Sequence, residues 1–398
     1  MFFRALFFYE RRFRSIKHGN ENGSSLFSQQ LSKTVCSFGW ILSLRHDQQH
    51  ACFDMTERID LSISREQSSA LKGLLIFLVV LGHNRFFDST FPKGCFEWLY
   101  CFHVAGFFIL PWFYDAHVFS WARVAKHAKR LLWPYSYMFV FLFILNYCFT
   151  RIARLDFGLI DTYLTGDFYT LRDYIGFQYL WFLPAMFSMV VLKDVYYSVN
   201  KKSRQVLYFL GFVSFLIVWI FLYKSPYPAV INHTIAKFSL FSIMMGLAML
   251  FLGISTRGLI ERYSLPKYIL IAIMAVSLAA MMIAARTAAR DVVWWICRLV
   301  CPVVGFSLLL SLGALYNTQF FRKLGGVSLS VYLIHQPLNF VVCSFLQRYN
   351  MPQLISFIIS FSVVLSISYF VSRLIAKIDP INRVLFPAGH SRRESARN

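Results

Sequence analysis

The stretch LKGLLIFLVVLGHN, residues 71–84, is the most informative part of the sequence. Its composition is that of a membrane-spanning helix, yet Lys72 lies near one end and His83 near the other. An ionisable side chain inside a membrane span costs about 2.5–3.5 kcal/mol on insertion scales. The presence of both residues in an apolar segment therefore calls for a structural or functional explanation.

The rest of the chain shares this apolar character. Of its 398 residues, 57% are hydrophobic and 15% are charged, and the mean hydropathy is +0.53. This charged fraction is below the value of about 25% that is typical of a soluble domain. The apolar runs are also long enough to cross the hydrocarbon core of a bilayer as helices. The sequence lacks the alternating strands of about ten residues that a β-barrel needs. It thus predicts an all-α polytopic membrane protein whose helices form one bundle.

The apolar runs predict about ten transmembrane helices. They cover residues 66–86, 96–114, 131–150, 177–193, 206–223, 237–254, 267–285, 292–315, 326–346 and 354–375.

The basic segments between these runs set the predicted orientation. They fall on one side of the predicted bundle, at residues 121–130, 193–204, 257–267 and 322–323 and in the tail. Because Lys and Arg are retained in cytoplasmic loops, we expect both termini to be cytoplasmic. The same bias accounts for the formal net charge of +21. We therefore expect contacts with membrane lipid and no nucleic-acid partner.

Three regions are predicted along the chain. Residues 1–64 form an N-terminal cytoplasmic extension, residues 65–376 the transmembrane domain, and residues 377–398 a cytoplasmic basic tail. Met55 begins a natural short lead-in to the first span, so we hypothesise that native translation starts at or near it. The eight Cys residues form no CxxC pair, and no metal-ligand spacing occurs, so we expect no metal.

Lys72 and His83 are spaced to share one helix face. Eleven residues at 100° each exceed three full turns by about 20°, and they separate the two side chains by about 16 Å along the axis. Ser64 and Gln67 form a capping-box pattern that starts this helix. Lys72 would then lie a few turns inside the cytoplasmic end, and His83 close to the opposite leaflet. The alternative is that Lys72 snorkels to the interface and His83 caps a helix end.

Glycines and further polar residues accompany this pair. Gly73 and Gly82 would allow a ligand or a neighbouring helix to approach closely. His103 can lie at a depth similar to His83, which suggests a polar chamber, although a lone His in an aromatic run is often a hydrogen-bonded structural group. His335 falls in the middle of the membrane, where an imidazole again needs a partner.

A basic segment precedes the third span. It contains Arg123, Lys126, Lys129 and Arg130. One interpretation is that these cations serve topology and contact anionic lipid headgroups. The other is that they dock a multiply phosphorylated cytoplasmic ligand.

Five motifs occur in a recognisable order. They are ALKGLLIFLVVLGHN, FHVAGFF, KRLLWPY, WFLPAMF and SLSVYLIHQPL. In this order, with ten residues between the basic residue and the His of the first motif, they resemble the integral-membrane acyltransferase family 3. That family includes bacterial O-acetyltransferases of O-antigen, capsule and exopolysaccharide sugars. The resemblance covers about residues 65–376.

The resemblance implies a membrane-bound O-acyltransferase of the bacterial inner membrane. Its donor would be cytoplasmic acyl-CoA, most commonly acetyl-CoA, and its acceptor a polysaccharide or a polyprenyl-linked sugar with a hydroxyl near the periplasmic face. His83 matches the family's catalytic histidine and Lys72 its paired basic residue. The segment with Lys126, Lys129 and Arg130 matches the family's site for the CoA phosphates.

Other site residues follow from the same motifs. We expect His103, Trp181 and His335 to contact the substrate. One departure bears on the substrate wall, because Pro111 and Trp112 stand where family members commonly carry Ser-Gly.

The chemistry fits an imidazole near neutral pH. A thioester is already activated, so the remaining need is to deprotonate and position a hydroxyl. His83 would act as general base, or alternatively as the nucleophile of an acyl-histidine relay. Asp88 and Glu97 are the carboxylates nearest to it in sequence that could orient it. Two other functions stay open at this point, a transporter or flippase of a lipid-linked saccharide and a non-catalytic scaffold of polysaccharide assembly.

Overall fold

The computed structural model describes residues 63–386, apart from 151–177, 223–239 and the single positions 264, 288 and 350. The chain divides into two compact units, Met1–Asp60 and Leu61–Asn398, and every described residue belongs to the second. The predicted N-terminal extension, the start at Met55 and most of the basic tail lie outside the described residues.

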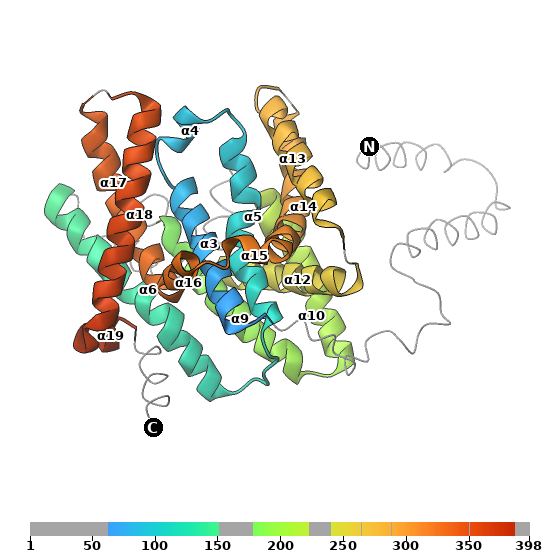
Figure 1. Ribbon diagram of the computed structural model, residues 1–398. Helices are drawn as coiled ribbons and strands as arrows, with labels where there is room; N and C mark the ends of the chain where they lie inside the picture. Colours follow the sequence, from blue (N-terminus) through green and yellow to red (C-terminus); the bar gives the residue numbers. More distant parts are fainter. Residues whose placement is uncertain are drawn as a thin grey trace, which may run out of the picture. The chain divides into compact units, whose positions relative to one another are not determined.

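The described part of the chain is helical and contains no strand, so the predicted all-α class is confirmed (Figure 1). The long helices are α3 (Arg65–Gly82), α5 (Cys95–Ile109), α6 (Trp121–Thr150), α9 (Phe182–Ser198), α10 (Lys201–Ser214), α12 (Leu240–Arg262), α13 (Lys267–Ala284), α14 (Arg290–Ser311), α17 (Ser328–Gln347) and α18 (Gln353–Lys377). Shorter elements are α4 (Phe87–Thr90), η4 (Leu110–Phe113), η5 (Gln178–Trp181), η6 (Phe215–Leu222), α15 (Gly313–Tyr316), α16 (Gln319–Gly326) and α19 (Asp379–Leu385).

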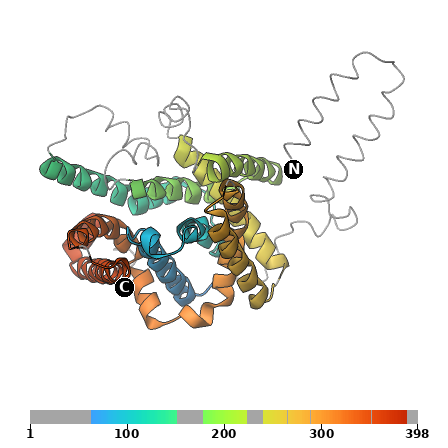
Figure 2. The same cartoon turned by 90° about the horizontal axis from the view of Figure 1, so that it is seen from above.

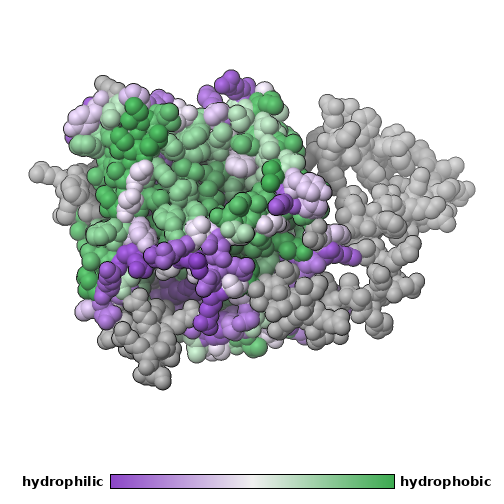
Figure 3. Space-filling view, viewed as in Figure 1, coloured by the Kyte–Doolittle hydropathy of each residue, from purple (hydrophilic) through white to green (hydrophobic). Residues whose placement is uncertain are grey.

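Seven described helical segments are long and apolar enough to cross a membrane. They are Cys95–Phe113, Tyr179–Ser198, Phe241–Arg262, Lys267–Ala284, Arg290–Ser311, Ser328–Gln347 and Gln353–Lys377. Each overlaps one of the predicted runs, and the number of about ten spans stays a prediction. Figure 3 shows a broad apolar surface on one face, with hydrophilic residues gathered mainly below it. Such a surface belongs in a bilayer rather than in water.

Helix α3 begins at the predicted capping box. The Ser64 hydroxyl accepts a hydrogen bond of 3.1 Å from the Gln67 backbone N–H, and the Gln67 side chain accepts one of 3.0 Å from the Ser64 N–H. Two N–H groups that the first helical turn leaves unpaired are thus satisfied. This capping prediction is confirmed.

Helix α3 occupies the centre of its unit. It contacts α5, α15, α16, α17 and α18, and the view from above shows it enclosed among these helices (Figure 2). On one side, α6, α9, α12 and α10 contact one another in that order and form a layer. Residues near the end of α3 therefore face protein on several sides.

Glycines bring α16 against the backbone of α3. A Cβ on Gly325 would overlap the Ser69 carbonyl and lie 2.8 Å from the Gly73 amide nitrogen. A Cβ on Gly73 would overlap the Phe321 carbonyl and lie 3.0 Å from the Gly325 nitrogen. The predicted close approach at Gly73 is therefore made by a neighbouring helix, and it fixes where α17 starts relative to α3.

The adjacent pair Gly325 and Gly326 gives a matched test of this packing. We expect Gly325→Ala to destabilise the protein by about 1–3 kcal/mol or more, because the new methyl group meets backbone atoms that cannot rotate away. Gly326→Ala should leave stability unchanged or slightly raised, because no atom lies within 4 Å of the added Cβ and Ala favours helix over Gly. Thermal unfolding in detergent, followed by Trp fluorescence, measures both. Equal melting temperatures for the two variants would contradict the packing.

Candidate active site

Three histidines from three helices meet beside the end of α3. The ring centroids of His83 and His335 are 5.2 Å apart. The Tyr100 ring lies between His83 and His103, with centroids 5.6 Å and 4.7 Å away. Helices α3, α5 and α17 thus contribute His83, His103 and His335 to one cluster of imidazoles, which we call the histidine cluster. The structure thus brings His83 and His103 close together, as expected, and adds His335 to them.

The tautomers of His103 and His335 follow from their hydrogen bonds. His103 Nδ1 lies 2.6 Å from the Leu99 carbonyl oxygen, and His335 Nδ1 lies 2.6 Å from the Tyr332 carbonyl oxygen. A carbonyl only accepts, so each Nδ1 carries the proton and donates it. In the neutral imidazole, Nε2 is then an acceptor. Both Nε2 atoms are buried and have no hydrogen-bond partner within the described part of the chain.

Buried acceptors of this kind are costly without a partner, at about 1–3 kcal/mol each. His103 and His335 are both fully buried, whereas His83 is half-buried. His83 is therefore the member of the cluster that a ligand reaches most directly. A ligand with hydroxyl groups could donate to the two Nε2 atoms while it contacts His83.

Tyr100 and Asn339 hold His83 in place. The Tyr100 hydroxyl lies 2.9 Å from His83 Nδ1 and 3.4 Å from Nε2. The Asn339 side-chain amide on α17 donates to the His83 carbonyl over 2.5 Å. The backbone N–H of His83 still donates to Val79, as in a helix, so His83 stays on the helical course of α3.

The residues on either side of His83 fix the end of α3. The Asn84 amide donates to the Ser360 hydroxyl of α18 over 2.8 Å, and its oxygen accepts from the Phe86 N–H over 2.9 Å. At Gly82, a Cβ would lie 3.2 Å from atoms of both Leu99 and Tyr100. The absence of a side chain there lets Tyr100 approach His83.

The carboxylates expected near His83 have other positions. Glu97 forms an ion pair with Arg290 of α14. Asp88 lies in α4, and partial burial raises its pKa, helped by the nearby Glu97 charge. The hydrogen-bond partner recorded at the His83 ring is the phenol of Tyr100, which the sequence analysis did not single out. Its position four residues after Phe96 and three before His103, on one face of α5, was the available signal.

His83 lies beside the middle of the two helices that it meets. Its neighbours His103 and His335 lie well inside α5 and α17, and its position relative to the opposite leaflet stays a prediction. In Figure 1 α3 ends below the top of the bundle, and the chain continues through the short helix α4. A residue count along α3 could not show how far its neighbours extend beyond it.

Aromatic side chains form a wall behind His335. The rings of Tyr179 and Tyr332 lie 5.8 Å and 5.7 Å from it. The Tyr179 hydroxyl donates to the Leu333 carbonyl over 2.9 Å, and the Tyr332 hydroxyl donates to the Tyr179 carbonyl. Trp181 joins this wall through Phe182, which packs on Tyr332 with ring centroids 5.1 Å apart. Trp181 itself is buried and stacks on Phe108.

Lys72 lies eleven residues before His83 on α3 and is half-buried. Because His83 remains on the helical course, the two side chains leave α3 on the same face, about 16 Å apart. The structure thus separates Lys72 from the histidine cluster along the axis and keeps both on one side of the helix.

The predicted cation site lies at the start of α6. Lys126, Lys129 and Arg130 are exposed there. The same helix is fixed against α9 by Arg123, whose Nε and Nη2 donate to the two Asp194 carboxylate oxygens over 2.8 Å and 3.2 Å. His127 lies 3.3 Å from the same carboxylate, and burial lowers its pKa despite that charge. Arg123 and His127 therefore join α6 to α9, whereas the three cations of the predicted site are exposed on the surface of α6.

The unusual pair Pro111 and Trp112 forms η4 after α5. Trp112 is buried, and a Cβ on Gly253 of α12 would overlap its indole ring. The Trp112 carbonyl accepts from Arg257 over 2.8 Å, and the Pro111 carbonyl accepts from the buried Lys193. This pair therefore packs α5 against α9 and α12, which is a structural role.

Within the described ranges, no group of three or more His, Cys, Asp or Glu side chains could hold a metal ion. The chemistry available at the histidine cluster is proton transfer and hydrogen bonding by imidazole and phenol groups.

Comparison with known proteins agrees with this chemistry. A family model described as an acyltransferase domain matches residues 66–373, and the chain therefore belongs to acyltransferase family 3, as its motifs indicated. No curated protein and no solved structure matches it. The family supports acyl transfer, with an acyl donor and an acceptor, and gives no support to the transporter alternative.

The tautomers of the cluster can be measured directly. We expect ¹⁵N spectra of histidine-labelled protein to show two imidazoles with a protonated Nδ1 and an unprotonated Nε2, which His103→Asn and His335→Asn assign by loss of one signal each. The physical reason is the carbonyl that each Nδ1 faces. Protonated Nε2 atoms in both residues would contradict the geometry. The exposed His117 provides a reference signal.

Proposed function

We propose that this acyltransferase transfers an acyl group, most commonly acetyl, from cytoplasmic acyl-CoA to a sugar hydroxyl. The acceptor would be an exported polysaccharide of the bacterial cell surface or its polyprenyl-linked precursor, and the protein would lie in the inner membrane with both termini cytoplasmic. The observation that supports this proposal is the half-buried His83 beside two buried imidazole acceptors, on the same helix face as Lys72.

His83 is the general base of the proposed reaction. The Tyr100 hydroxyl lies 2.9 Å from His83 Nδ1, and the proposal assigns the proton to Nδ1, which leaves the Nε2 lone pair to take the proton of the acceptor hydroxyl. The hydroxyl oxygen attacks the thioester carbonyl, the new C–O bond forms, and the C–S bond breaks. The CoA thiolate then takes the proton from His83. No proton is lost or gained overall.

His103 and His335 bind the acceptor in this proposal. A sugar presents several hydroxyl groups, and each can donate to an Nε2 that otherwise has no partner in the described part of the chain. Pairing these buried acceptors recovers the cost of leaving them unsatisfied. Trp181, joined to His335 through the aromatic wall, supports the shape of this sugar site.

Lys72 and the start of α6 bind the donor. Lys126, Lys129 and Arg130 would contact the CoA phosphates at the cytoplasmic surface. The pantetheine arm would then run along the α3 face past Lys72, over a separation of about 16 Å, comparable with its extended length. The deep position of His83 suits a thioester delivered from the cytoplasm to the middle of the bundle.

His83→Ala should reduce acyl transfer by about 10²–10⁴-fold, because the general base is removed. The measurement is the transfer of radiolabelled acetyl from acetyl-CoA to the sugar fraction in proteoliposomes. The control is His117→Ala, since His117 is an exposed loop residue away from the cluster, and it should keep full activity. Normal transfer by His83→Ala would remove His83 from the mechanism.

The three α6 cations can be tested by comparing donors. Lys126→Gln, Lys129→Gln and Arg130→Gln should each raise KM for acetyl-CoA about tenfold, because each removes a charge-assisted hydrogen bond to phosphate. KM for S-acetylpantetheine, which lacks the nucleotide phosphates, should stay unchanged.

Lys201→Gln and Lys202→Gln on α10 serve as controls, because they remove exposed cations elsewhere. If the controls raised KM equally, or if KM rose for S-acetylpantetheine as well, these cations would not recognise the CoA phosphates.

A further inference from the structure

Three aromatic rings from three helices lie next to the histidine cluster. Phe182 of α9 packs against Phe107 of α5 and Tyr332 of α17, with ring centroids 5.8 Å and 5.1 Å apart. We call Phe107, Phe182 and Tyr332 the aromatic band. The Tyr332 ring also lies 5.7 Å from the ring of His335, so the band adjoins the cluster directly.

The direction of α5 places Phe107 on the side of the cluster that faces the start of α3. Tyr100 contacts His83 at the end of α3, whereas a hydrogen bond of 2.6 Å joins Tyr114, beyond η4, to Ser68 in the first turns of α3. Helix α5 therefore runs antiparallel to α3. Phe107 follows Tyr100 by seven residues and thus lies about 10 Å nearer to the start of α3.

Helix α17 places Tyr332 at a similar level. Gly325, just before α17, packs against the Ser69 carbonyl in the first turns of α3, and Asn339 donates to the His83 carbonyl. Helix α17 therefore runs parallel to α3. Tyr332 precedes Asn339 by seven residues, again about 10 Å. In the predicted orientation, both outer rings of the band thus lie on the cytoplasmic side of His83.

The donor route of the proposed function passes this band. Acyl-CoA would enter from the cytoplasm with its acyl group leading and its pantetheine arm along the α3 face between Lys72 and His83. These two residues are about 16 Å apart along the axis, so the band lies between their levels. Phe107 is half-buried whereas the adjacent Phe108 is fully buried, as expected for a ring that borders open space. The acyl group therefore has to pass the band before it reaches His83.

The band presents ring surface and no available hydrogen-bond donor. The Tyr332 hydroxyl donates its one hydrogen to the Tyr179 carbonyl, and Phe107 and Phe182 have none to offer. An acyl group with a carboxylate would lose its hydration there without a compensating hydrogen bond. A bulky acyl group would have to push apart rings of which Phe182 and Tyr332 are already buried in close packing.

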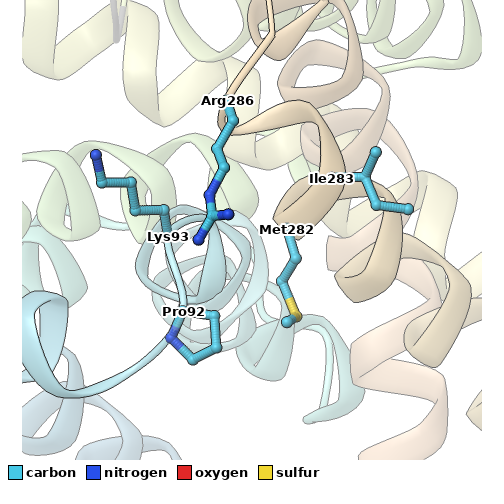
Figure 4. Close-up of a pocket in the computed structure, with 5 residues that line it drawn as sticks. All are labelled: Pro92, Lys93, Met282, Ile283 and Arg286. Carbon is cyan, nitrogen blue, oxygen red and sulfur yellow. The ribbon is translucent and has the colours of Figure 1, made fainter.

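Figure 4 shows a cavity of about 310 Å³ that lies on a different side of α5. It is lined by Pro92, Lys93, Met282, Ile283 and Arg286. On that side the Trp98 indole of α5 donates to the Ser277 hydroxyl of α13 over 2.8 Å. Tyr100, His103 and Phe107 share another face of α5, so this cavity is not part of the donor route.

We propose that the aromatic band is a selectivity filter that admits a small, uncharged acyl group to His83 and excludes bulky or carboxylated ones. The inference rests on the proposed function, because it specifies the acyl group of that donor. Phe182 is the specificity-determining residue, since its ring contacts both Phe107 and Tyr332.

Transfer from acetyl-CoA, benzoyl-CoA and succinyl-CoA in proteoliposomes tests the filter. The wild-type protein should use acetyl-CoA and discriminate against the other two. Phe182→Leu and Phe107→Leu should each raise the ratio of kcat/KM for benzoyl-CoA to that for acetyl-CoA about tenfold or more, since even one methylene group changes the selectivity of an apolar pocket about 10–200-fold. Succinyl-CoA should stay excluded, because leucine supplies no hydrogen-bond donor. The ratio is the decisive quantity, because a general loss of folded protein lowers both rates alike.

Phe306→Leu is the matched control. Phe306 of α14 is a buried ring that packs on Phe113 and lies outside the band, so its replacement should leave the benzoyl-to-acetyl ratio unchanged. The proposal is overturned if the wild-type protein uses benzoyl-CoA as well as acetyl-CoA. It is also overturned if Phe182→Leu and Phe107→Leu leave the ratio unchanged, or if Phe306→Leu raises it equally.

Binding without turnover separates this inference from the proposed function. The thioethers S-ethyl-CoA and S-benzyl-CoA cannot transfer their alkyl groups as acyl donors do. The wild-type protein in nanodiscs should bind S-ethyl-CoA about tenfold more tightly, and Phe182→Leu should reduce that difference. If both thioethers bind the wild-type protein equally while transfer requires His83, the filter fails alone. If His83→Ala transfers acetyl normally while Phe182→Leu still changes the ratio, the proposed role of His83 fails and the filter stands.

Discussion

The hydrogen bonds that a buried imidazole must make determine the arrangement of the site. His103 and His335 each donate Nδ1–H to a carbonyl of their own helix, so no neighbouring helix is needed to hold them. Their Nε2 atoms are thereby kept for a ligand. His83 differs, because α5 and α17 supply Tyr100 and Asn339 to hold it. The contact of Gly325 in α16 with the backbone of α3 helps to set the position of α3, and this position brings these groups within bonding distance.

Much of the fold could be predicted because membrane-spanning helices are recognised from the length and apolar composition of their segments. The apolar runs predicted the helices, and the capping box at Ser64 predicted the start of α3. The meeting of His83 with His103 followed from counting residues along antiparallel helices. The depth of His83 could not be predicted in this way, because it depends on where α17 starts, and that is set by the backbone contact between Gly325 and Ser69. Such contacts join residues that are distant in sequence.

The partners of the polar residues could not be predicted either, because they too are distant in sequence from the residues that they contact. Tyr100 looked like one aromatic among many in α5, and only the packing of Gly82 against it shows why it reaches His83. Pro111 and Trp112 departed from the family pattern, which suggested a change in the substrate wall. In the structure they fill a space beside Gly253 and accept hydrogen bonds from Arg257 and Lys193. A departure from a motif can thus be compensated by packing rather than by a change of substrate.

The tautomers of His103 and His335 also bear on how the reaction ends. Both imidazoles present lone pairs, and under the proposed function these would attract a sugar through the hydrogens of its hydroxyl groups. In the proposed reaction, acylation replaces the hydrogen of the hydroxyl at His83 by an acyl group, and the ester oxygens can only accept. If an acylated sugar turned its ester toward either Nε2, two hydrogen-bond acceptors would face each other and no hydrogen bond could form. Under the proposed function, the histidine cluster would therefore disfavour an acylated sugar in that orientation, and the hydrogen bonds that recruit the acceptor would also limit product inhibition.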